Sequence, residues 1–89
     1  MNSSNKKFLA EICNELGDYY YKKFDYEKAL LEYKSSAKVY LELKMKLENA
    51  KLHRMIGEVY MFLAEFKKAL KHNEIYLGEL NFQCLDKLV

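Results

Sequence analysis

The strongest constraint on this chain is a self-similarity at an offset of forty residues. Shifting the sequence by forty aligns Gly17 with Gly57, and identical residues recur around them: Ala10 with Ala50, Tyr20 with Tyr60, and Lys28-Ala29-Leu30 with Lys68-Ala69-Leu70. A fixed period of about 20 to 50 residues is the sequence signature of repeat architectures. The chain is therefore predicted to contain two copies of one structural unit.

Composition makes those units helical. The 89 residues include no proline and three glycines, too little turn material for a sandwich or barrel that turns every ~8 to 12 residues. An all-α fold is predicted, with helices over residues 7–22, 26–46, 49–63 and 66–80 and a tail or fifth helix from Asn81. Asp25 is the expected N-cap of the second helix, and Gly78 is expected to help end the fourth.

The first unit resembles the tetratricopeptide repeat, through the runs Cys13-x2-Leu16-Gly17-x2-Tyr20 and Ala29-x3-Tyr33. The second unit reads His53-x2-Ile56-Gly57-x2-Tyr60 and Ala69-x3-Asn73, so its last aromatic is lost, and neither unit has the closing proline. The resemblance implies two tandem helical hairpins at 9–47 and 48–80, a lead-in at 1–8, and a partial third-repeat helix or capping tail at 81–89. Each glycine is expected to let the second helix approach closely, with Ala29 or Ala69 facing it.

A second resemblance is narrower. The chain is similar to the N-terminal repeats of the Tonsoku-like family, through the segments Ala10-x2-Cys13-x2-Leu16-Gly17-Asp18, Ala50-x2-His53-Arg54-x-Ile56-Gly57-Glu58 and Ala69-Leu70-x-His72-x3-Tyr76-Leu77. This resemblance implies a non-catalytic protein-interaction module of a nuclear scaffold for replication-fork repair and recombination. The alternative is a generic adaptor with forty-residue repeats, of the Pins-like kind.

Other function classes find little support in the residues. The longest uncharged runs have six residues, far short of the ~18 apolar residues of a membrane span, and residues 1–7 lack the apolar region of a secretory signal. The net charge of +2 and pI near 8.4 argue against nucleic-acid binding. His53 and His72 are too far apart in sequence to predict a metal site, so neither an enzyme nor a cofactor is expected. Because a secretory signal is lacking, an intracellular location is expected. Cys13 and His53 occupy positions that the repeat turns inward. Cys13 is expected to be an inert buried thiol, and His53 a half-buried imidazole that forms a hydrogen bond.

Function in such a fold is expected on its surface, where the first helix of each unit lines a concave groove for a peptide or helix of a partner protein. The repeat resemblance implies the groove-facing positions Glu11, Asn14, Asp18 and Tyr21 in the first unit and Lys51, Arg54, Glu58 and Met61 in the second. Acids at Asp18 and Glu58 depart from the chaperone-adaptor version, which binds a C-terminal carboxylate. They favour a partner segment that carries both charges and an apolar stripe. The alternative is that Arg54 and Glu58, four residues apart, simply pair with each other.

A second function class is self-association. Two repeats leave both end faces of the stack apolar, and such arrays need further units or a cap. Phe82, Leu85, Leu88 and Val89 stand at helical spacing and are expected to cover an end face in the same chain or in a partner copy, which would give a homodimer.

Overall fold

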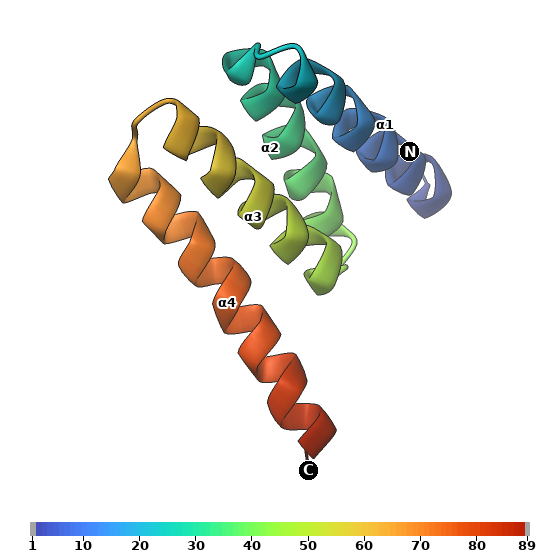
Figure 1. Ribbon diagram of the computed structural model, residues 1–89. Coiled ribbons are helices and arrows are strands. Elements are labelled where there is room, and N and C mark those ends of the chain that lie inside the picture. The colour runs from blue at the N-terminus through green and yellow to red at the C-terminus, as the bar shows by residue number, and fades with distance from the viewer. Residues whose placement is uncertain (1, 89) are drawn as a thin grey trace.

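The protein is a stack of two helical hairpins. The computed structural model describes the backbone of residues 2–88 and the side chains of residues 2–79. Its helices are α1 (Ser3–Lys22), α2 (Tyr26–Glu42), α3 (Lys46–Phe62) and α4 (Phe66–Leu88). Each helix packs against the next one along the chain, as Figure 1 shows. The predicted all-α repeat fold is confirmed.

The helices are joined by three turns of the same kind. Phe24, Lys44 and Ala64 have left-handed φ angles of 64°, 60° and 60°. In the first turn the backbone N–H of Asp25 donates to the carbonyl of Tyr20 at 2.9 Å, and the other two turns repeat this bond. This is the Schellman ending of a helix, in which glycine usually takes the left-handed position. The turns recur every twenty residues, so the forty-residue period is two helices and two turns.

Helix boundaries differ from the predicted ones for local reasons. The side chain of Asn2 accepts from the backbone N–H of Asn5 at 2.9 Å, so α1 begins at Ser3, within the expected lead-in. The left-handed Lys44 ends α2 at Glu42, and the prediction that this helix reaches Lys46 is wrong. The N-cap predicted at Asp25 is confirmed, since its carboxylate accepts from the N–H of Lys28 at 3.3 Å.

The end predicted for the fourth helix is also wrong. Gly78 lies inside α4 without a positive φ, and the helix runs on to Leu88, so no fifth helix begins at Asn81. A Cβ at Gly78 would meet nothing within 4 Å, so no contact requires the chain to turn there. The side chains from Asn81 onward, and with them the expected capping role, lie outside the described residues. The division into units at 9–47 and 48–80 remains a prediction.

The two repeat glycines mark close approaches between helices. A Cβ at Gly17 would stand 2.6 Å from Cδ1 and Cε1 of the Tyr33 ring, so this tyrosine, and not the expected Ala29, is the nearest facing group. At Gly57 a Cβ would stand 2.7 Å from Oδ1 of Asn73 and 3.3 Å from the carbonyl oxygen of Ala69. Tyr33 and Asn73 are themselves forty residues apart. The same inter-helix contact is therefore made in both units, with a smaller side chain in the second.

Small residues bring the helices together in the core. Buried alanines lie on α1, α2, α3 and α4, among them Ala10, Ala29 and Ala69 at 0 to 1% exposure. Two buried polar side chains bond neighbouring helices: Ser36 Oγ donates to the carbonyl of Ala10 at 2.7 Å, and Asn49 Nδ2 donates to the carbonyl of Ala37 at 2.8 Å. These bonds fix α2 against α1 and α3 against α2. Within the described residues, no helix is both long and apolar enough to cross a membrane.

Candidate functional site

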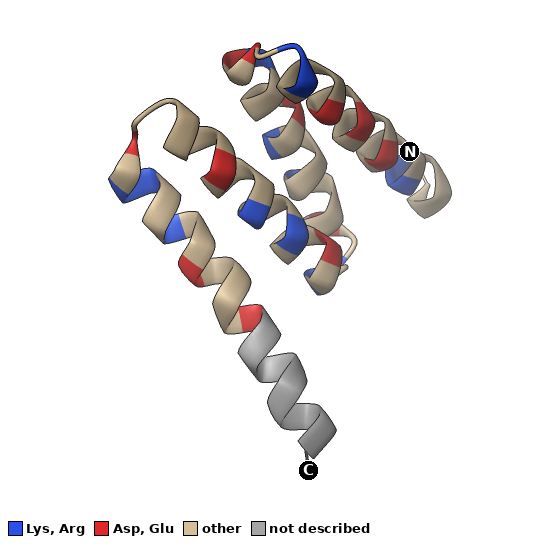
Figure 2. Ribbon diagram, viewed as in Figure 1, with Lys and Arg blue, Asp and Glu red and all other residues tan. Residues whose placement is uncertain are grey.

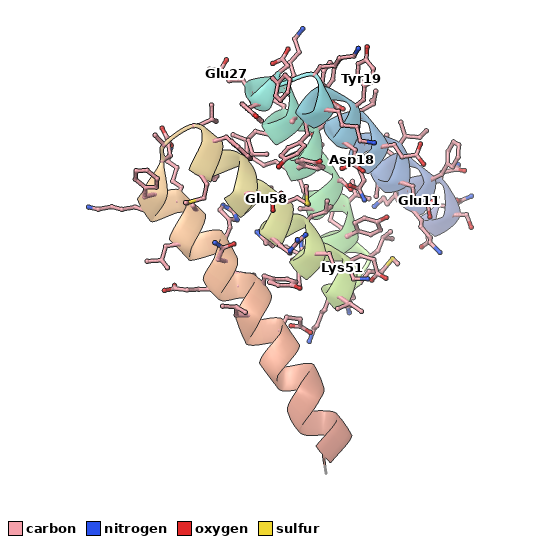
Figure 3. The ribbon with its side chains drawn as sticks, in the orientation of Figure 1. Glu11, Asp18, Tyr19, Glu27, Lys51 and Glu58 are labelled. Carbon is pink, nitrogen blue, oxygen red and sulfur yellow. The ribbon has the colours of Figure 1, made fainter. Side chains whose placement is uncertain are left out.

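The first helices of the two units, α1 and α3, carry the predicted groove residues. Figure 3 shows Glu11 and Asp18 along α1 and Lys51 and Glu58 along α3. The Tyr21 hydroxyl donates to Glu58 Oε2 at 3.1 Å, which joins the two helices directly. Burial, followed by this hydrogen bond to a carboxylate, raises the pKa of Tyr21. The raised pKa keeps the Tyr21 hydroxyl protonated, so that it can donate this bond between α1 and α3.

Asp18 is held in place by its own unit. The Tyr33 hydroxyl donates to Asp18 Oδ1 at 2.5 Å, and the Tyr33 ring, fully buried, covers Gly17. Burial and the bond to Asp18 raise the pKa of Tyr33 far above its usual range. Two predicted contact residues, Asp18 and Glu58, thus accept hydrogen bonds from tyrosines. Their first role is to position the groove helices.

The remaining predicted residues are more open. Glu11, Lys51, Arg54 and Met61 are exposed, and Asn14 is half-buried on α1. Among the described side chains, Arg54 and Glu58 do not form the alternative ion pair; instead Arg54 Nη1 lies 3.6 Å from the sulfur of Met55. Figure 2 shows acids along α1 and both bases and acids along α3. Of the predicted groove residues, Glu11 and Asp18 on α1 are acidic, Lys51 and Arg54 on α3 are basic, and Glu58 adds an acid to α3.

A hollow of about 330 Å³ opens between α3 and α4. Three predicted residues, Arg54, Glu58 and Met61, line it from α3, and Asn73, Tyr76 and Leu77 line it from α4. The residues on α4 were not among the predicted ones. The sequence contained one indication of them, since Asn73 stands where the first unit has its aromatic Tyr33.

A histidine pair bonds α3 to α4 on another side. The Nδ1 atoms of His53 and His72 are 2.6 Å apart, their rings are stacked, and His72 also stacks on Tyr60. Burial, with the nearby charges of His53, Lys34 and Lys71, lowers the pKa of His72 to about 4, and burial likewise lowers that of His53. The predicted half-buried, hydrogen-bonded state of His53 is confirmed. The bond needs one unprotonated Nδ1, so the interface excludes a doubly charged pair.

Neither this pair nor the described cysteine indicates a reactive centre. Cys13 is half-buried, and burial, followed by the charge of Glu32, raises its thiol pKa, which disfavours the nucleophilic thiolate. Among the residues whose side chains are described, no three histidine, cysteine or acidic groups come together as metal ligands. The described surface offers charged and apolar side chains.

Comparison with known proteins finds a similar sequence of known family. The chain is 37% identical over 76 residues to the Tonsoku-like protein of Drosophila melanogaster, a match that covers 85% of this chain and 5% of that protein. No model of a known protein family matches the sequence, and no solved structure matches the fold. The chain resembles the helical repeat region of a Tonsoku-like protein, and it spans about 5% of that relative's length.

Proposed function

We propose that this chain is a protein-interaction module of a Tonsoku-like scaffold, and that it binds a segment of a partner protein across α1 and α3. The observation that supports this best is the bond between Tyr21 and Glu58, which connects the two helices directly. A preorganised surface loses less freedom on binding than a mobile one. The exposed charges of Glu11, Lys51 and Arg54 stand on that fixed surface.

The charges define the partner's chemistry. An incoming segment would place a basic residue over the acids of α1, such as Glu11, and an acidic residue over Lys51 and Arg54 of α3. Exposed Met61 adds an apolar contact on α3, one turn beyond Glu58. Complementary charges across an interface set orientation and association rate more than affinity. The expected ligand is a segment with acidic and basic residues on either side of an apolar side chain.

The cellular role follows from the resemblance alone. A module of a Tonsoku-like scaffold would act in the nucleus, in replication-fork repair by homologous recombination. In that setting its contribution would be to hold another repair or chromatin protein. The alternative, a generic adaptor with forty-residue repeats, would use the same groove with another partner.

A peptide display library provides the test. Peptides selected on the wild-type chain should carry an acidic residue at a fixed distance from a basic one, with an apolar residue between them. Lys51→Glu and Arg54→Glu should each weaken the binding of a selected peptide about fivefold to tenfold, and a peptide with its acid changed to lysine should restore affinity to these variants only. Glu27→Lys is the matched control, because Glu27 lies exposed at the start of α2, away from the labelled groove residues in Figure 3.

Two results would contradict the proposal. One is a selection that yields no common charge pattern. The other is a set of peptides whose affinity is the same for the wild type and for both glutamate variants, with helicity by circular dichroism unchanged. Rescue by the reversed peptide is the decisive measurement, since a variant that merely disturbed the fold would not regain affinity for a complementary charge.

A further inference from the structure

One side of α1 carries an exposed apolar stripe. Leu9, Ile12, Leu16 and Tyr19 follow one another at helical spacing and are 40%, 38%, 41% and 54% exposed. Side chains three and four positions apart on a helix share a face. A stripe of four large apolar side chains is what a helix presents to a packing partner.

The second unit shows what covers this stripe. The positions forty residues later are Asn49, Leu52, Ile56 and Val59 on α3, and these are 9%, 2%, 1% and 0% exposed. They face α2: Asn49 donates to the carbonyl of Ala37, and Ile56 lines a hollow together with Ala37 and Leu41 of α2. The stripe on α1 therefore corresponds, position by position, to the surface of α3 that packs against α2.

The opposite end of the stack carries the matching half. Leu30 of α2 packs against the core and Ala37 is 5% exposed, whereas their counterparts on α4, Leu70 and Leu77, are 60% and 54% exposed. Leu77 also lines the hollow between α3 and α4. In the first unit, the residues that correspond to Met61 and Leu77 of this hollow are Tyr21 and Ala37, and both of these bond to α3. The hollow is therefore the place where a further helix like α3 would lie.

We propose that the exposed face of α4, which carries Leu70 and Leu77, binds the α1 stripe of a second copy of the chain, so that copies stack head to tail. The contact would repeat the α2–α3 interface that already exists inside each copy, with α4 in the role of α2 and α1 in the role of α3. The inference goes beyond the groove function. Stacking would leave Glu58 accessible, because its counterpart Asp18 is exposed, but it would cover Met61, whose counterpart Tyr21 is half-buried and bonds α3. A head-to-tail contact joins two different surfaces, so it does not stop at a symmetric dimer but adds further copies, in an open stack or a closed ring.

Charge is complementary at the same contact. Inside the chain Lys34 of α2 lies over the Tyr60 ring at 5.2 Å. In the proposed contact its counterpart Glu74 would lie beside Tyr20 of the next copy, where Lys28 already stands 5.6 Å from the ring. Glu74 and Lys28 would then face each other with opposite charges. This pairing favours α4 on α1 over two like helix faces.

The test uses one variant for each half of the contact. Sedimentation equilibrium of the wild-type chain over a dilution series should give a mass that rises past that of the dimer. Leu16→Lys blocks the α1 stripe and Leu77→Lys blocks the exposed face of α4, and each alone should raise the concentration needed for association at least about tenfold. An equimolar mixture should form one heterodimer and stop, because only one intact pair of surfaces remains.

Controls keep the result decisive. Leu31 of α2 is 66% exposed, and the corresponding residue of the second unit is Lys71. The Leu31→Lys variant should therefore associate like the wild type. If Leu16→Lys fails to fold by circular dichroism, Tyr19→Lys replaces it, since Tyr19 is the most exposed member of the stripe. A wild type that stays monomeric at every concentration overturns the proposal. So does a single variant that still dimerises alone, which would mean a symmetric contact. The groove proposal is tested separately, by measuring peptide affinity on dilute, monomeric protein, because stacking would cover Met61.

Discussion

The three glycines allow a sharp test of why the repeat needs them. Replacing a helical glycine by alanine gains about 1 kcal/mol of helix propensity where nothing interferes. At Gly78, where a Cβ would meet nothing within 4 Å, Gly78→Ala should therefore stabilise the fold by up to about 1 kcal/mol. That raises the melting temperature by about 4 to 8 °C in a domain of this size.

At Gly17 the same substitution should have the opposite effect. The new methyl group would stand 2.6 Å from two ring carbons of Tyr33, so that fully buried ring must move. Overpacking costs about 1 to 3 kcal/mol, and loss of the bond from Tyr33 to the Asp18 carboxylate about 1.5 to 3 kcal/mol more. After the propensity gain, Gly17→Ala should destabilise the fold by about 1.5 to 5 kcal/mol.

The assay is urea denaturation at pH 7.5, followed by circular dichroism at 222 nm on dilute protein. The midpoint should rise for Gly78→Ala and fall for Gly17→Ala at an unchanged slope. Gly57→Ala should lie between them, because Oδ1 of Asn73 can rotate away while the Ala69 carbonyl at 3.3 Å yields only slightly. A Gly17→Ala variant as stable as the wild type would refute the close-approach explanation.

Three further predictions concern the turns, the histidine pair and the buried serine. Ala64→Gly should stabilise the fold by about 1 kcal/mol in thermal unfolding, because Ala64 holds a left-handed φ of 60° that costs an L-residue about that much. The folded-state pKa of His72, about 4, lies below its ordinary 6.5, so the unfolded chain binds the proton more readily. Stability should thus be full above about pH 6.5 and fall by about 1 to 2 kcal/mol toward pH 4, the partial exposure of the ring limiting the loss; His72→Gln should flatten this pH profile, and an unchanged slope would contradict the assignment. Ser36→Ala should cost about 1 kcal/mol in urea, since it removes the buried hydrogen bond that Ser36 donates to the carbonyl of Ala10, whereas Ser35→Ala, on the exposed side of the helix, should be near neutral.

The repeat and its register could be predicted from the sequence because they are periodic. Composition predicted the helical class, and Gly17 and Gly57, with the alanines that follow them, predicted the forty-residue unit. The cap at Asp25 was equally predictable, since an N-cap acts within one turn of its own helix. What the sequence misplaced was the end of helices. The residues with left-handed φ angles are Phe24, Lys44 and Ala64, and none of them is the glycine that usually marks a helix end. Gly78, which was expected to end a helix, lies inside α4.

Tertiary structure decided which side chains meet. His53 and His72 are nineteen residues apart and share no local motif, yet stacking α4 on α3 brings their Nδ1 atoms within 2.6 Å. Glu58 looked like a free groove acid or a partner for Arg54, but the distance between α1 and α3 gives it to Tyr21 instead. The apolar periodicity of α1 and α3 is the same in sequence, and only the packing shows that Ile56 is covered while Leu16 is not. Local patterns are written in the spacing of residues along one helix, whereas contacts and exposure depend on which helix lies next to it.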